Sequence, residues 1–194
     1  HWQRALEINS NDTQAHINLG VILVGRGRLD EAIAHYQKAL NIEPDDPKGQ
    51  SHLGIALVAR GQPVEAAIHL RKALESMPND ARLHSYLGLA LAAGGHIDEA
   101  IGHYRRGLEI KPDDAQAHYN LGNTLVGRGK ADEAIAEYRT ALKIRPDYAA
   151  AHGNLGAVLV ASGQPGEGIA HYRKALNIKP GSAQTQNNLA WLLA

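Results

Sequence analysis

The chain has 194 residues, of which 44% are apolar, enough to bury a core and to exclude a disordered chain. Twenty basic and twenty acidic residues leave no formal net charge, so the field of the whole chain offers nucleic acid or an anionic bilayer no general attraction. Because the sequence contains no cysteine, disulfides, thiolate zinc sites and cysteine nucleophiles are excluded.

The dominant pattern along the chain is an internal repeat of 34 residues. Prolines at 44, 78, 112, 146 and 180 keep this step, and so do glycines at 20, 54, 88, 122 and 156. A period of this length is typical of helix-turn-helix arrays. The step predicts half a unit equivalent to a second helix (1–10), five complete units (11–44, 45–78, 79–112, 113–146 and 147–180) and half a unit equivalent to a first helix (181–194).

Each complete unit predicts two helices joined by a tight turn. In the fourth unit, His118, Leu121 and Leu125 share one helical face, and a second apolar helical pattern runs from Ala134 to Ile144. Aspartates are predicted to cap first helices and prolines to begin helices, and glycines are predicted to adopt positive φ in the turns. The caps are Asp12, Asp46, Asp80 and Asp114, the prolines are Pro47, Pro63 and Pro165, and the turn glycines are 27, 61, 95, 129 and 163.

A second set of glycines lies inside the predicted first helices, at Gly20 and its equivalents. A glycine in the middle of a helix lowers helix stability by about 1 kcal/mol relative to alanine. Its recurrence indicates that another helix passes too close for a side chain.

These residues resemble the tetratricopeptide repeat (TPR) family, in which Leu–Gly, a turn Gly, Glu–Ala, an aromatic residue, Ala and a closing Pro recur. The fourth unit carries them as Leu121–Gly122, Gly129, Glu133–Ala134, Tyr138, Ala141 and Pro146. The resemblance implies an all-α, right-handed superhelical α-solenoid whose first helices line a concave groove. Departures include histidine for the usual large residue at 16, 84, 118 and 152, glutamine at 50, and Gly168, which is expected to loosen its helix pair.

The stretch "GNTLVGRGK", residues 122–130, imitates a phosphate-binding loop. A true loop of this kind follows a strand and ends in Gly-Lys-Ser/Thr, because the lysine and hydroxyl engage the phosphates and Mg²⁺. Here Gly127 is followed by Arg128 and Gly129, and Gly122 lies within a predicted helix. No nucleotide site and no other cofactor site is predicted.

The best candidate site is a row of side chains along the first helices, opposite the predicted core face. An amide offers both donors and an acceptor, as a peptide bond does, so a row of amides can hold an extended backbone. Small and apolar residues on the same face, such as Val126 and Ala161, leave room for a ligand. The row consists of Asn18, His52, Tyr86, Asn120, Asn154 and Asn188, with Asn123 beside it.

The row is similar to the asparagine ladder in the superhelical repeats of O-linked N-acetylglucosamine transferases, and this similarity implies a grip on peptide backbones. The alternative is that each asparagine bonds to a neighbouring repeat or to water.

Lys48 and Arg82 stand one repeat apart on this face, as a basic pair suited to a carboxylate or as two solvated charges. The dicarboxylate clamp of chaperone-binding members is not matched, because the first-helix lysine is missing and Tyr86 replaces the arginine.

The eleven histidines predict no metal site. Equivalent positions in adjacent repeats lie too far apart for metal bonds of about 2 Å. No pairing of a nucleophile with a base emerges either.

The sequence therefore predicts a non-catalytic scaffold that binds a protein or an extended peptide in its groove, with nucleic acid and membrane excluded as partners. Two alternatives remain: the substrate-recognition arm of a larger enzyme such as a glycosyltransferase, and a self-assembling scaffold. Both ends match partial repeats, at 1–10 and 181–194. Head-to-tail association through these ends is therefore expected.

Overall fold

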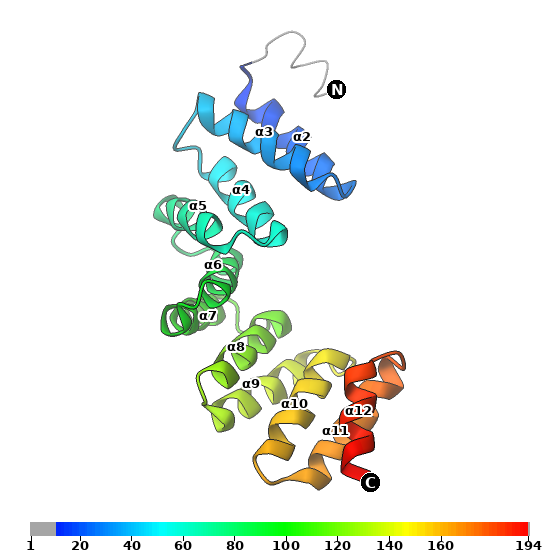
Figure 1. Ribbon diagram of the computed structural model, residues 1–194. Helices are drawn as coiled ribbons and strands as arrows, with labels where there is room; N and C mark the ends of the chain where they lie inside the picture. The colour runs from blue at the N-terminus through cyan, green and yellow to red at the C-terminus, as the bar shows by residue number, and fades with distance from the viewer. Residues whose placement is uncertain (1–10, 194) are drawn as a thin grey trace. The chain divides into compact units, whose positions relative to one another are not determined.

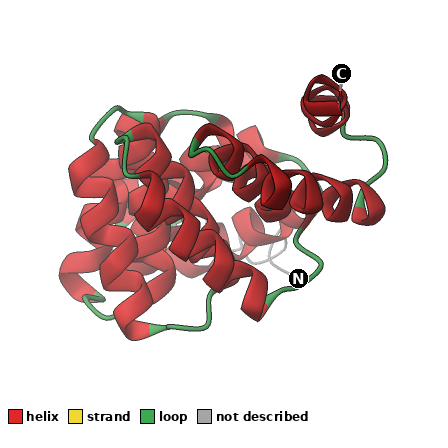
Figure 2. Cartoon of the chain, turned by 90° about the horizontal axis from the view of Figure 1, so that it is seen from below, coloured by secondary structure: helices red, strands yellow, loops and turns green. Residues whose placement is uncertain are grey.

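The computed structural model describes residues 11–193, and every regular element in that range is a helix (Figures 1 and 2). The half-unit predicted at 1–10 lies outside the described residues. The helices are α2 (Thr13–Gly25), α3 (Leu29–Ile42), α4 (Pro47–Arg60), α5 (Pro63–Ser76), α6 (Ala81–Ala93), α7 (Ile97–Ile110), α8 (Ala115–Gly127), α9 (Ala131–Ile144), α10 (Ala149–Ala161), α11 (Pro165–Ile178) and α12 (Ala183–Leu193).

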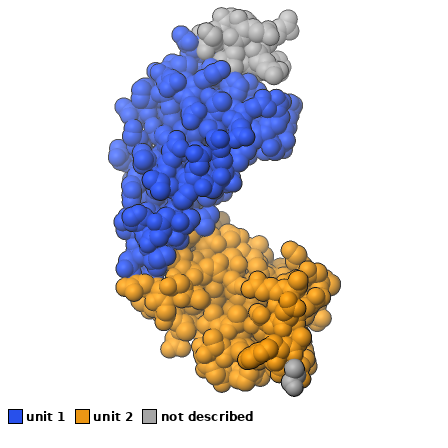
Figure 3. Space-filling view, in the orientation of Figure 1, with its two compact units in different colours: residues 1–103 blue, residues 104–194 orange. Residues whose placement is uncertain are grey.

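The chain divides into two compact units, one ending at His103 and one beginning at Tyr104, so that the boundary lies within α7 (Figure 3). Among the helices described between residues 11 and 193, the main contacts within each unit join helices one or two places apart along the chain. This neighbour-to-neighbour packing is typical of a solenoid. The predicted fold class, an all-α solenoid of helix-turn-helix repeats, is confirmed.

The predicted turns and caps are present. All five turn glycines have positive φ, for example 80° at Gly129. Each of the four predicted aspartate caps accepts a hydrogen bond from a backbone N–H in the first helical turn, as Asp46 does from Gly49 at 2.6 Å. The three prolines stand at the first positions of α4, α5 and α11, where a missing N–H leaves no helical bond unmade.

Gly20, Gly122 and Gly156 inside the first helices face a tyrosine of the second helix, and Gly54 faces Leu70 at the same position. A Cβ at Gly122 would lie 2.6 Å from Cε1 of Tyr138, and Gly20 has the same relation to Tyr36. Both tyrosines are almost completely buried. The predicted close approach is therefore confirmed, and it occurs between the glycine and a tyrosine ring.

The prediction for Gly168 is wrong. A Cβ at this position would lie 2.5 Å from Cγ2 of Val160 and 2.8 Å from the carbonyl oxygen of Gly156. The missing side chain lets α11 approach α10 closely, so Gly168 tightens this helix pair.

Candidate functional site

In the first unit, the predicted row consists of half-buried side chains with different roles. Asn18 on α2 accepts a hydrogen bond from Nε2 of Gln14 at 3.1 Å. His52 on α4 stacks on Tyr36, with ring centroids 5.5 Å apart and planes 13° apart. Tyr86 on α6 is half-buried. The row in this unit is thus part amide and part aromatic.

Lys48 and Arg82 are exposed and lie near the same ring. Burial is the main cause that lowers the pKa of His52, and the charges of Arg82 and Lys48 lower it further. His52 is therefore neutral at pH 7, and the two cations supply the positive charge around it. Both cations of the predicted basic pair therefore act on the same row residue, and the charge of Asp46 opposes them.

In the second unit, the asparagines bond to each other and to tyrosines of the preceding repeat. Nδ2 of Asn154 donates to Oδ1 of Asn123 at 2.7 Å and to the Tyr119 hydroxyl at 3.2 Å. The Tyr138 hydroxyl also donates to Oδ1 of Asn123, at 2.8 Å. The alternative in which asparagines bond to a neighbouring repeat therefore describes Asn154, and it also describes Asn188, which donates to the Tyr172 hydroxyl of the preceding repeat. Asn123 accepts the hydrogen bond from the hydroxyl of the buried Tyr138.

Each asparagine of the row keeps part of its amide unused by the described residues. Asn120 accepts from Nε2 of Gln116 at 3.0 Å and keeps its Nδ2 donors, as Asn18 does. Asn154 and Asn188 have the opposite arrangement, because Nδ2 of Asn188 donates to the Tyr172 hydroxyl at 3.3 Å. In both, Oδ1 is left as an acceptor. The face thus offers both kinds of group that a peptide backbone needs.

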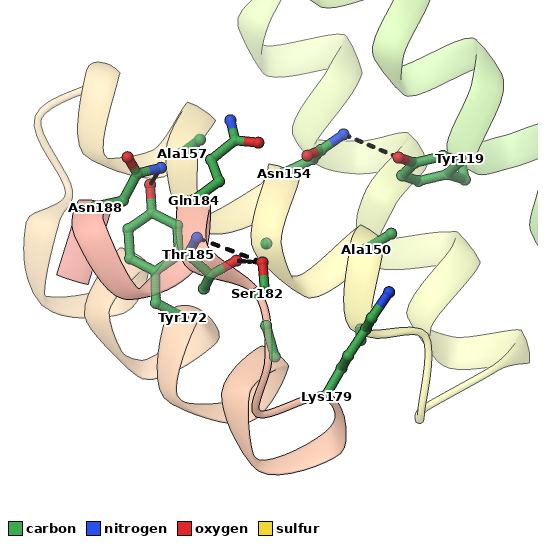
Figure 4. Close-up of a pocket in the computed structure, with 13 residues that line it drawn as sticks. Tyr119, Ala150, Asn154, Ala157, Tyr172, Lys179, Ser182, Gln184, Thr185 and Asn188 are labelled. Atoms are coloured by element: carbon green, nitrogen blue, oxygen red, sulfur yellow. Dashed lines mark hydrogen bonds between the residues drawn. The ribbon is translucent and has the colours of Figure 1, made fainter.

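Two residues of the row line one pocket of about 250 Å³ between α10 and α12 (Figure 4). Asn154 and Asn188 lie on either side of it, and Gln184 and Lys179 add polar groups. Its small lining residues are Ala149, Ala150, Gly153, Ala157 and Ala175, and Tyr119, Tyr172, Ser182 and Thr185 complete it. Asn120 is not part of this lining. Sequence reasoning missed Lys179, Gln184 and Ser182, although Ser182 stands at the position of the aspartate caps and Gln184 at the position of Lys48 and Arg82.

Aromatic rings extend the same face toward α8. The rings of Tyr119 and Tyr148 lie 4.9 Å apart, and the Tyr148 hydroxyl donates to Oε1 of Gln116 at 2.8 Å. The guanidinium of Arg145 lies 4.0 Å above the Tyr148 ring, a cation–π contact that holds the ring in place. A smaller apolar pocket of about 240 Å³ includes Val126 and Ala161. The predicted apolar contacts are therefore available in this unit.

The histidines form pairs that sequence reasoning missed. Nδ1 of His84 lies 3.0 Å from Nδ1 of His103, and the corresponding distance is 2.9 Å for His16 with His35 and for His152 with His171. Each pair joins the first and second helix of one repeat. The comparison of equivalent positions in adjacent repeats could not detect these contacts.

The tautomers in these pairs follow from the second bond of the first-helix ring. Nε2 of His84 donates to the carbonyl oxygen of Pro78 at 3.0 Å, so its Nδ1 is the acceptor in the neutral ring. His103 then donates from Nδ1. Burial is the main cause that lowers the pKa of His103, and the neighbouring His84 lowers it further.

Repeats two and four replace one histidine of the pair. Oε1 of Gln50 accepts from Nδ1 of His69 at 2.6 Å. In the fourth repeat, Nδ1 of His118 donates to Oε2 of Glu137 at 2.6 Å, and this bond raises the pKa of His118. Within residues 11–193, no three histidine, aspartate or glutamate side chains gather as metal ligands would. The helices described there are also too short or too polar to cross a bilayer.

Family models match most of this repeat pattern. A TPR repeat model matches residues 22–61, 90–127 and 122–163, and a tetratricopeptide repeat model matches 149–182. The chain belongs to the tetratricopeptide repeat family. No curated protein sequence matches it significantly.

Solved structures of other TPR proteins share this fold. YrrB, described as a TPR protein with an unusual peptide-binding site, superposes with a TM-score of 0.77 at 24% identity, over 96% of both chains. MamA superposes with a TM-score of 0.76 at 26% sequence identity, and the match covers 89% of this chain and 94% of the MamA chain. TTC0263, a thermophilic TPR protein in Thermus thermophilus, superposes with a TM-score of 0.71 at 23% sequence identity, and the match covers 94% of this chain and 99% of the TTC0263 chain.

The TPR assignment makes this chain a protein-interaction scaffold. The similarity of its asparagine row to that of O-linked N-acetylglucosamine transferases stays a prediction, since the matched models and structures are those of TPR proteins in general.

Proposed function

We propose that the chain binds an extended peptide along the first-helix face of its second unit. The observation that carries this proposal is the pocket between α10 and α12, which two asparagines of the predicted row line together (Figure 4). The proposal assigns binding, and no catalysis, to these residues.

The chemistry of the pocket fits a peptide backbone. Oδ1 of Asn154 and Oδ1 of Asn188 can accept backbone N–H groups, and the amide of Gln184 can donate to a carbonyl. Alanines and Gly153 let the ligand approach closely. Each such hydrogen bond contributes about 0.5–1.5 kcal/mol. Micromolar affinity, about −8 kcal/mol, therefore also needs the apolar contacts near Val126 and Ala161. The peptide-binding site named for YrrB, a protein of the same fold, supports the proposal.

The first test selects binding peptides from a random library on the immobilised chain and measures their affinity by calorimetry. Asn188→Ala removes an acceptor, and Ala150→Leu fills the pocket from an exposed position. Each change is expected to weaken binding about three- to tenfold. Asn154 is a poorer target, because its loss also removes the hydrogen bonds that it donates to Asn123 and Tyr119.

Gly166→Ala is the control, since a Cβ at this position of α11 meets nothing within 4 Å. It should leave affinity unchanged. Peptides that bind all four proteins equally, with the helical circular dichroism of each intact, would rule out the pocket.

Self-association is the second candidate. Trp191 and Leu193 of α12 are 78% and 59% exposed, although both are large apolar side chains. Such a face can dock on a second copy. The other predicted end, 1–10, lies outside the described residues. Sedimentation velocity over a wide concentration range tests this candidate, and a single monomeric species throughout would exclude it.

A further inference from the structure

A second groove opens on the second-helix side of the same unit, between α9 and α11. It has a volume of about 520 Å³. Leu142, Pro146 and Ile178 give it apolar walls, and Arg139, Lys143 and Lys174 surround them with cations. It has no acidic residue in its lining. Both this groove and the pocket between α10 and α12 take residues from α10 and α11, but no residue lines both, so this is a separate surface.

Two of the three cations are available to a ligand. Arg139 is held by Glu167, with Nη2 and Oε1 2.8 Å apart, so these two charges largely cancel. Lys143 and Lys174 are exposed, and neither forms an ion pair within residues 11–193. Lys143 lies on α9 and Lys174 on α11, so the two positive charges stand on opposite helices of the groove.

This charge pattern is particular to the groove between the fourth and fifth repeats. One repeat earlier, Glu109 and Thr140 occupy the positions of Lys143 and Lys174. Glu137 there faces His118, where the fifth repeat has His171 facing His152. The repeat pattern therefore does not require cations here.

The paired side chains of His152 and His171 line the groove and carry no charge. Nε2 of His152 donates to the Pro146 carbonyl oxygen at 3.0 Å, and the Nδ1 atoms of His152 and His171 lie 2.9 Å apart. Burial is the main cause that lowers the pKa of His171, followed by the charges of His152 and Lys174. Both rings are therefore neutral at pH 7, and the lysines carry the charge.

We propose that this groove binds an acidic peptide segment that carries aliphatic side chains. A leucine of the ligand packs against Leu142, Pro146 and Ile178, and carboxylates before and after it meet Lys143 and Lys174. The groove is open to the surface, so it suits side chains that project from a segment continuing on both sides. Charge complementarity with two unpaired cations selects an acidic partner.

The test measures the fluorescence anisotropy of a fluorescein-labelled peptide, GELEELEG, with the full chain at low ionic strength. The double variant Lys143→Glu/Lys174→Glu is expected to weaken binding about tenfold, because two attractions become repulsions. Lys38→Glu/Lys72→Glu is the matched control. It makes the same change in net charge at the positions equivalent to Lys174 in the first two repeats, and it should keep the affinity within about twofold.

Two further peptides separate the contribution of charge to binding from that of the apolar contact. Replacing glutamate by glutamine should weaken binding less than the lysine changes do, because it removes the attractions without adding repulsions. Replacing leucine by serine should weaken binding through the lost apolar contact. Equal binding by both double variants would overturn the proposal. So would binding to phosphatidylglycerol vesicles without binding to the peptide, since that would indicate a membrane surface.

Asn188→Ala distinguishes this proposal from the peptide-binding pocket. A peptide held between α9 and α11 does not contact Asn188, so its affinity should be unchanged. If Asn188→Ala weakens GELEELEG while Lys143→Glu/Lys174→Glu does not, the acidic peptide binds on the first-helix face and the groove proposal is wrong.

Discussion

At the scale of single residues, two glycines in α8 differ in the space around them: a side chain at Gly122 would clash with a neighbour, whereas a side chain at Gly127 would not. Gly122 faces the ring of the buried Tyr138, and a Cβ would lie 2.6 Å from it. Gly122→Ala should therefore destabilise the chain by about 1–3 kcal/mol, because the ring must move within a packed core. Urea unfolding measured by circular dichroism gives this difference.

Gly127 is the matched control within the same helix. A Cβ there meets nothing within 4 Å. Gly127→Ala should be neutral or stabilise the chain by up to about 1 kcal/mol, since alanine favours the helix. If both changes have the same effect, helix propensity and not the tyrosine ring decides the cost.

At the scale of elements, the histidine contacts join the two helices of each repeat and make stability depend on pH. Folding lowers the pKa of His35, His103 and His171, mainly through burial. Such groups stabilise the fold fully above the unfolded value of about 6.5, and this stability is lost as the pH falls below it. His118 has the opposite effect, because the hydrogen bond to Glu137 raises its pKa. The stability that His118 contributes to the fold is therefore lost as the pH rises.

The pKa values of six histidines are lowered and that of His118 is raised, so the urea concentration at the midpoint of unfolding should decrease as the pH is lowered from about 7.5 to about 5.5. Glu137→His turns the fourth repeat into a histidine pair like those of its neighbours and should make the fall steeper. His103→Glu makes the reverse change and should make it shallower. Identical pH profiles for all three proteins would contradict the assignment of the effect to these contacts.

The same elements show what the sequence can and cannot predict. Spacing predicts helices, caps and turns, because each depends on residues close together in one repeat, such as Asp46 with Gly49. It also places Asn154 and Asn188 on one face. Contacts between residues 19 or 31 apart, such as His84 with His103 and Asn123 with Asn154, depend on how two helices pack, and a 34-residue period does not contain that information.

At the scale of the whole molecule, packing only between neighbours limits how far a local change spreads. Exposed ion pairs also link successive repeats, for example Arg105 with Glu133 at 2.8 Å, but each contributes little. The stability of a repeat therefore rests mainly on its own core and its nearest interfaces. A defect in one unit should be felt most within that unit.

Leu155 and Leu57 test this expectation, because both are completely buried leucines, in α10 and α4 respectively. Replacing either by alanine should cost about 2–5 kcal/mol through lost burial and a cavity. Amide hydrogen exchange measured by mass spectrometry should then rise mainly in α8 to α12 for Leu155→Ala, and mainly in α2 to α6 for Leu57→Ala. A uniform rise along the whole chain in both variants would mean that the array unfolds as one cooperative body and that the coupling between its repeats exceeds the cost of the cavity.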